Sequence, residues 1–145
     1  MTDRYETFTL LISRINRNIR KIKNIKMAEY GLKSIHISCL YYLSKPYETT
    51  PGVLCKLCEE DKAAISRALD FLEEKGYVVP RQHKKKYKSP VLLTEEGKRI
   101  SMEIAMKIDG VLDEIAAVLS NEERESFYRS LALISDGLDK ITKKL

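Results

Sequence analysis

Two clusters of side chains have the chemistry to bind a polyanion. The segment from Arg81 to Ser89 carries five positive charges and no acid, and lysine and arginine bind nucleic-acid phosphates by releasing counterions. A second cluster follows Asp61, where small, hydroxyl and basic side chains alternate; in a DNA groove such side chains can touch thymine methyls or bond to base edges. The residues that we expect to contact DNA are Thr50, Lys62, Ala63, Ala64, Ser66, Arg67, Arg81, Lys84, Lys85, Lys86 and Lys88.

The cysteines offer a different chemistry. Cys55 and Cys58 form a C-x-x-C motif inside an expected helix, where residues three apart share a face. Such a pair can bind a soft metal or form a disulfide. However, no histidine or second cysteine pair stands at ligand spacing, and structural zinc needs four ligands. We therefore interpret both thiols as buried and inert, and we expect neither a metal site nor a cofactor.

Enzyme motifs are absent from the sequence. It contains no G-x-G-x-x-G, P-loop, H-E-x-x-H or G-x-S-x-G. The acidic run Glu59, Glu60 and Asp61 stands between two expected helices, a position that favours helix capping over acid/base catalysis. We expect a protein that binds rather than catalyses.

The elements that must position these side chains are mainly helices. Apolar residues recur at spacings of three and four over residues 8–25, 100–119 and 127–145, which predicts three long helices. Shorter helices are expected over residues 34–44, from Pro51 to near Glu60, and from Asp61 to about Lys75. The last two helices are joined by almost no linker, which is typical of a helix-turn-helix.

After Gly76 the pattern changes to two short β-type runs, residues 77–79 and 91–93, on either side of the basic segment. Pro80 and Pro90 limit any pairing to a brief ladder. The expected fold is mainly α with a small β-hairpin wing, a winged helix-turn-helix over residues 31–100. The helices of residues 1–30 and 101–145 are too apolar on one face to stand alone in water, so we expect them to dimerise about a two-fold axis.

Length, composition and charge agree with a single domain. The chain has 145 residues, 43% hydrophobic and 32% charged, with a net charge of +5, which favours an anionic partner. No stretch has the roughly 18 apolar residues of a membrane helix, and the first 20 residues lack the apolar core of a signal peptide. Three cysteines, an odd number, fit reduced thiols. We expect a cytoplasmic protein with no membrane partner.

Three stretches of the chain resemble the MarR family of bacterial transcriptional regulators. They are residues 61–69 (Asp-Lys-Ala-Ala-Ile-Ser-Arg-Ala-Leu), 72–78 (Leu-Glu-Glu-Lys-Gly-Tyr-Val) and 93–98 (Leu-Thr-Glu-Glu-Gly-Lys). The resemblance implies a homodimer whose terminal helices interlock. It also implies a repressor-type regulator that binds a pseudo-palindromic operator in double-stranded DNA and releases it when a small-molecule effector binds.

An effector of this kind is expected at the junction of the DNA-binding and dimerisation parts. The side chains that we expect around it are His36, Tyr41, Met102 and Met106. Two other functions stay open. One is a thiol- or metal-responsive winged-helix regulator, similar to ArsR-like sensors, with its switch at Cys55 and Cys58. The other is a helical interaction protein whose basic wing contacts RNA or another acidic partner.

Overall fold

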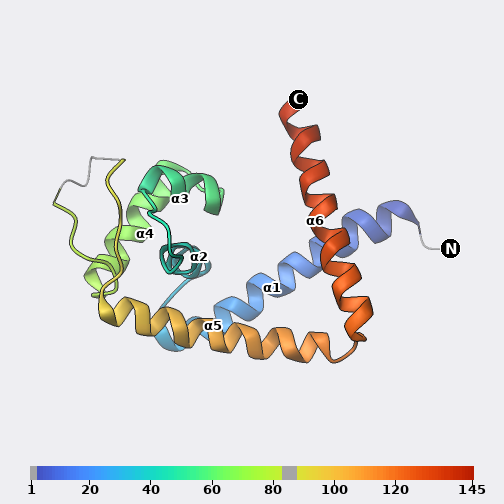
Figure 1. Ribbon diagram of the computed structural model, residues 1–145, viewed down its shortest axis with the longest axis horizontal. Coiled ribbons are helices and arrows are strands. Elements are labelled where there is room, and N and C mark those ends of the chain that lie inside the picture. The colour runs from blue at the N-terminus through green and yellow to red at the C-terminus, as the bar shows by residue number, and fades with distance from the viewer. Residues whose placement is uncertain (1–2, 83–87) are drawn as a thin grey trace. The chain divides into compact units, whose positions relative to one another are not determined.

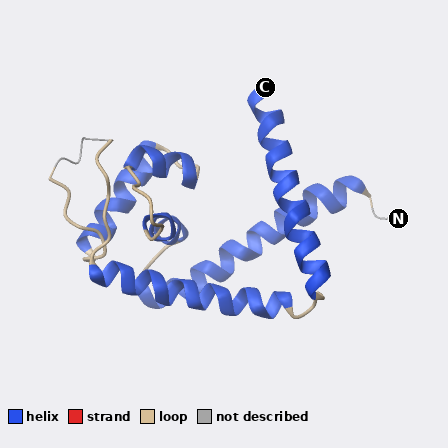
Figure 2. Cartoon of the chain, in the orientation of Figure 1, coloured by secondary structure: helices blue, strands red, loops and turns tan. Residues whose placement is uncertain are grey.

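The computed structural model describes residues 3–82 and 88–145, and most of them are helical (Figures 1 and 2). The α-helices found in these ranges are α1 (Leu11–Met27), α2 (Ser34–Leu43), α3 (Pro51–Cys58), α4 (Lys62–Glu74), α5 (Glu95–Ala116) and α6 (Asn121–Lys144). A π-helical turn, Glu6–Leu10, leads into α1, and a 3-10 turn, Ala28–Tyr30, follows it. None of the helices in the two described ranges is long and apolar enough to cross a bilayer. The mainly α fold is confirmed.

Local capping explains where several helices begin. The Thr50 hydroxyl accepts the Val53 amide at 3.2 Å at the start of α3, and the Asp61 carboxylate accepts the Ala64 amide at 2.7 Å at the start of α4. Ser120 opens α6 with a reciprocal capping box. Each bond satisfies an amide that has no partner within its helix. These are the start positions that the sequence predicts.

The expected β-hairpin is reduced to a single antiparallel bridge between Val78 and Leu93. Two backbone hydrogen bonds of 2.9 and 3.0 Å flank this bridge, and no longer strand forms in the described part of the chain (Figure 2). A β-hairpin wing is therefore not confirmed. Pro80 and Pro90 interrupt the pairing on the side of the basic segment, because a proline has no amide hydrogen to donate to a ladder.

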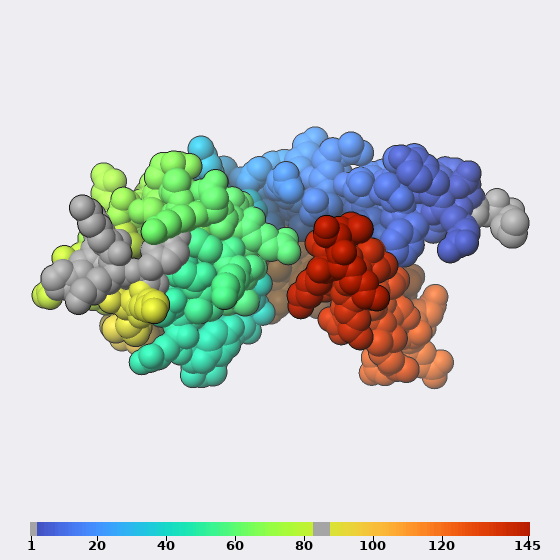
Figure 3. All heavy atoms as spheres, turned by 90° about the horizontal axis from the view of Figure 1, so that it is seen from above, coloured from blue at the N-terminus to red at the C-terminus, as the bar shows by residue number. Residues whose placement is uncertain are grey.

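The first of two compact units spans Met1–Lys107, and its core lies among α2, α3 and α4. These helices form a continuous packed mass in Figure 3, and α1 extends away from them in Figure 1. Side chains from each of the three helices are fully buried, and so is the last residue of α1; examples are Met27, Leu40, Leu54, Ile65 and Leu69. Burying one such side chain stabilises the fold by about 1.5–3 kcal/mol, so the core holds α4 in one orientation.

The long helices leave their apolar faces exposed. Along α1 and the turn before it, the exposed apolar side chains include Phe8, Leu11, Ile12, Ile15, Ile19, Ile22 and Ile25. The second compact unit, Ile108–Leu145, contains the end of α5 and all of α6. In α6, which is described over its whole length, no residue is buried. Its exposed apolar side chains include Phe127, Leu131, Leu138 and Ile141.

Candidate nucleic-acid interface

The N-terminal end of α4 presents small and basic side chains to solvent. Ile65 is fully buried and sets the rotation of the helix. Ala63 and Arg67 are therefore exposed on the opposite side, one turn apart, and Ser66 is half-buried beside them. Arg67 forms no hydrogen bond or ion pair with any residue of the described ranges. Of the other residues predicted here, Lys62 is exposed and Ala64 is half-buried.

The turn before α4 is tight and acidic. Its three residues are Glu59, Glu60 and Asp61, and Glu59 adopts the left-handed conformation with φ 54°. The Glu60 amide donates to the Cys55 carbonyl at 3.1 Å, which closes the last turn of α3. The acidic run thus ends one helix and caps the next, as the sequence predicts, and joins α3 to α4 as a helix-turn-helix.

Thr50 lies at the start of α3 rather than on α4. Its side chain is half-buried, and its hydroxyl oxygen accepts the Val53 amide. The hydroxyl hydrogen can still be donated to a phosphate. A DNA contact by Thr50 therefore stays a prediction beside its capping role.

Arg81 is held against α4 by two carboxylates. Its Nη2 lies 2.6 Å from Asp70 Oδ1 and its Nε lies 3.2 Å from Glu73 Oε2, and only 11% of its side chain is exposed. Asp70 follows Arg67 by three residues. If its carboxylate were not paired with Arg81, it would repel a DNA phosphate bound near Arg67 on the same face of α4. The structure therefore gives Arg81 a positioning role that sequence analysis missed. The available signal was the pair of acids one helical turn apart on α4.

The remaining basic residues can be placed only in part. Lys88 is exposed. Lys84, Lys85 and Lys86 lie outside the described residues, so their contacts with DNA stay predictions. At one end of the basic segment Arg81 is paired with α4, and at the other end Lys88 is exposed.

The four side chains expected around an effector do not line a common cavity. His36 is buried and stacks on Phe71, with 4.2 Å between ring centroids; its Nδ1 accepts a backbone amide at 2.9 Å, and burial lowers its pKa. Tyr41 and Met106 are 53% and 72% exposed. Met102, near the start of α5, lines a cavity. His36 is a satisfied core histidine because α2 turns it toward α4.

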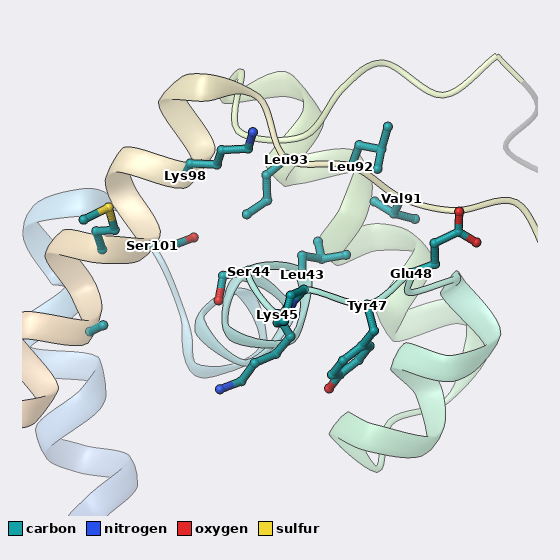
Figure 4. A pocket seen from close by; sticks show the side chains of 13 residues that line it. Leu43, Ser44, Lys45, Tyr47, Glu48, Val91, Leu92, Leu93, Lys98 and Ser101 are labelled. Carbon is teal, nitrogen blue, oxygen red and sulfur yellow. The ribbon is translucent and has the colours of Figure 1, made fainter.

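The cavity that Met102 lines has a volume of about 690 Å³ and lies between the end of α2, residues 91–93 and the first turns of α5 (Figure 4). Leu43 and Leu93 contribute apolar wall, and Lys98 and Ser101 contribute polar groups from α5. An apolar cavity with a few polar groups is typical of small-molecule sites. No sequence spacing indicates this cavity, because its walls come from segments about fifty residues apart.

The cysteines are arranged differently from the sequence interpretation. Cys55 and Cys58 are only half-buried, so the expectation that both are buried is wrong; α3 is short, and its last turn reaches the surface. Cys39 of α2 is the buried thiol. Its S–H donates to Cys58, which lowers the pKa of Cys58 and raises the pKa of Cys39. In the described part of the chain, no three His, Cys, Asp or Glu side chains are grouped to hold a metal.

Comparison with known proteins gives one relative in sequence and several in structure. No model of a known protein family matches the chain. YwoH of Bacillus subtilis (strain 168), described as an uncharacterized HTH-type transcriptional regulator, is 30% identical over 120 residues, which cover 81% of this chain and 88% of YwoH. The chain covers most of that relative, so the similarity extends well beyond the helix-turn-helix.

Two solved structures share the fold. A MarR transcriptional regulator from Methanosarcina mazei Go1 has a TM-score of 0.84 and 23% identity, covering 97% of this chain and 94% of that one. The S. aureus MepR protein in its DNA complex has a TM-score of 0.79 and 19% identity, covering 90% and 97%. Both agree with the helix order and the helix-turn-helix described above. The chain belongs to the helix-turn-helix transcriptional regulators, and its fold is that of the MarR-family structures.

Proposed function

We propose that the protein is a homodimeric regulator that binds a pseudo-palindromic operator in double-stranded DNA and inserts the start of α4 into the major groove. The observation that carries this proposal is the exposed start of α4. The small side chains of Ala63 and Ser66 leave room there for the edges of base pairs, and the Arg67 guanidinium has no partner among the described residues. In a helix-turn-helix, this end of the second helix contacts base edges. The likeness to the MepR fold found in a DNA complex supports the same docking.

The basic segment completes the proposed interface by contacting phosphates. Arg81 holds the start of the segment against α4 through Asp70 and Glu73. Lysine binds phosphate as a point charge without the planar fork of arginine. We therefore assign affinity to Lys84, Lys85, Lys86 and Lys88, and sequence readout to α4.

Operator binding is tested on the DNA that flanks the protein's own gene. We expect a footprint with two symmetric half-sites whose centres lie about 10 base pairs apart, one helical turn. The affinity should exceed that for a scrambled duplex by roughly 10³-fold or more, because specific sites are bound that much more tightly than random DNA. Equal binding of both duplexes would contradict the proposal.

The exposed apolar faces of α1 and α6 support the homodimer. Phe127, Leu131, Ile134, Leu138 and Ile141 follow one another at alternating spacings of four and three, a seam that suits another helix. Two-fold association lets the same faces of two copies cover each other. An interface of the usual 1,200–2,000 Å², by order of magnitude, is within reach of two long helices per chain.

Light scattering tests this seam. The wild type should have about twice the 16.7 kDa mass of the chain, and the double variant Leu131→Glu, Leu138→Glu should be monomeric, because two copies would bury four carboxylates. Leu133→Glu makes the same substitution two residues away from Leu131, off the seam, and should remain dimeric. A monomeric wild type at micromolar concentration would rule out the dimer.

The cavity beside α5 is our candidate for the effector. Residues 91–93 on its wall follow the basic segment directly, and α5 on the other wall leads toward the second unit. The apolar wall and Lys98 suit a small amphipathic anion. A molecule bound there would contact the residues that follow the basic segment in the chain.

A further inference from the structure

We propose that a pair of side-chain contacts locks the end of α1 to α5 and thereby sets the spacing of the half-sites that a dimer accepts. The lock consists of Tyr30 with Glu103 and of Glu29 with Lys107. These are positioning residues, because they act through the helices that they join and not through a contact with DNA. The lock itself stands on contacts within the first compact unit, and its effect on half-site spacing rests on the function proposed above.

The first argument is that α1 has little hold on the core by itself. In α1, which is described over its whole length, only the last residue, Met27, is buried. The chain then passes through the turn Ala28–Tyr30 before α2 begins. By contrast, α5 is attached to the core through Ile100 and Ile104, which are both buried. A link from the turn to α5 is therefore also a link to the core.

The second argument is the geometry of the lock. The Tyr30 hydroxyl donates to Glu103 Oε2 at 3.2 Å, although the two residues are 73 positions apart in the chain. Lys107 forms an ion pair with Glu29, and its Nζ lies over the Tyr30 ring, 4.9 Å from the centroid. Glu103 and Lys107 are one helical turn apart on the same face of α5. Two adjacent residues of the turn are therefore held at two points along α5, which restricts both sliding and rotation.

The third argument is that the lock is oriented by its neighbours on α5. Oε1 of Glu103 accepts from Arg99, one turn earlier, and Oε2 accepts from Tyr30. Arg99 is held in turn by Glu96, whose Oε2 lies 3.1 Å from the arginine Nε. Burial and the hydrogen bond to Glu103 both raise the pKa of Tyr30 above its usual value. The phenol therefore keeps its proton at neutral pH and remains a donor.

The lock contributes to rigidity more than to stability. The side chains of Glu103, Lys107 and Glu29 are 42%, 38% and 56% exposed, and exposed ion pairs add little to the free energy of unfolding. Loss of the lock should therefore leave the core of α2, α3 and α4 folded. Its consequence should be a freer turn and an α1 whose direction varies.

The direction of α1 matters because the proposed dimer is held partly by its exposed apolar face. If α1 and α6 contact the second copy, the angle between α1 and the core determines how far apart the two α4 helices stand. Moving a half-site by one base pair shifts it by about 3.4 Å and turns it by roughly 35° around the duplex axis. A dimer with fixed α1 helices rejects such a shift, and a dimer with free α1 helices follows it.

Amide hydrogen exchange tests the lock on the full-length protein without DNA. Tyr30→Phe removes only the hydroxyl, and Glu103→Leu removes its acceptor. In the wild type the amides of Gly31 and Leu32 bond back across the turn at 3.0 and 3.4 Å. In both variants these amides should exchange at least about threefold faster, because the turn opens more often, while amides at the centre of α4 should be unchanged.

Matched variants separate the lock from the substitutions themselves. Tyr128→Phe and Glu114→Leu change an exposed tyrosine of α6 and an exposed glutamate of α5, and the turn should exchange in both as in the wild type. Glu103→Gln keeps an acceptor oxygen for Tyr30 and should retain most of the protection. The double variant Tyr30→Phe, Glu103→Leu should exchange no faster than Glu103→Leu, because both changes remove one bond. Wild-type exchange in Tyr30→Phe, or additive effects in the double variant, would overturn the lock.

The effect on spacing is measured separately, by titrating operator duplexes whose half-site centres are moved closer or apart by one or two base pairs. The wild type should bind its native spacing at least about tenfold more tightly than the altered duplexes, because a rigid dimer must deform the DNA to reach both half-sites. Tyr30→Phe should keep its affinity for the native spacing within about threefold and should discriminate among the spacings by less than about threefold. Tyr128→Phe should discriminate as the wild type does.

The two measurements also separate the possible failures. Faster exchange at the turn, together with wild-type discrimination among the spacings in Tyr30→Phe, would overturn the effect of the lock on DNA binding. A wild type that prefers no operator duplex over a scrambled one would contradict the proposed function and the effect on spacing together. The exchange rates of Tyr30→Phe and Glu103→Leu would then decide the lock alone.

Discussion

Gly97→Ala is expected to lower the free energy of unfolding by at least about 2 kcal/mol, because the added methyl group has no room. Its Cβ would lie 2.0 Å from the Tyr77 carbonyl oxygen and 2.9 Å from the carbonyl carbon. Both atoms belong to the backbone, so no side-chain rotation can relieve the overlap. The same Tyr77 oxygen accepts the Thr94 amide at 3.0 Å, and the Thr94 hydroxyl donates to the Gly76 carbonyl at 2.6 Å. The start of α5 must therefore separate from the turn that follows α4.

Gly110→Ala is the matched control for this substitution. Gly110 lies in the same helix, and its added methyl group would meet no atom within 4 Å. Alanine also has the higher helix propensity, by up to about 1 kcal/mol, so this variant should unfold at an equal or higher urea concentration. Urea unfolding followed by circular dichroism measures both variants. Equal midpoints for Gly97→Ala and wild type would show that α5 does not need this close approach.

Arg67→Ala is expected to cost about 2–6 kcal/mol of operator affinity, since each guanine contact contributes about 1–3 kcal/mol and a two-fold dimer makes it twice. Arg67 is exposed at the start of α4 without a partner in the described ranges. Its planar fork can bond to two acceptors on the guanine edge. Discrimination should relax at one base pair in each half-site, at symmetric positions. Titrations of operator and scrambled duplexes at several salt concentrations measure the loss.

Two controls separate base readout from charge. Arg67→Lys keeps the charge but lacks the fork, so it should retain affinity for the scrambled duplex and lose operator preference. Arg129→Ala removes the same charge from an exposed position on α6 and should change binding to both duplexes only slightly. If Arg67→Ala weakens operator and scrambled duplexes equally, Arg67 is a phosphate contact and base readout belongs to other residues.

The sequence by itself determined the features that depend on near neighbours. Helix starts at Thr50, Asp61 and Ser120 follow from a side chain bonding to an amide three residues later. The buried face of α4, with Ile65 at its centre, follows from helical periodicity. The brief pairing beside Pro80 follows from the missing amide hydrogen. These interactions act within a few residues, so spacing alone reveals them.

Only the tertiary structure decided which distant side chains meet. Arg81 stands in the basic segment but pairs with Asp70 and Glu73 of α4. Residue types show what each group can bind, but not which partner is near. That depends on how α2, α3 and α4 pack around their core, because each buried side chain sets the rotation and depth of its helix. Contacts between helices are therefore properties of the whole packed arrangement and leave no local pattern in the chain.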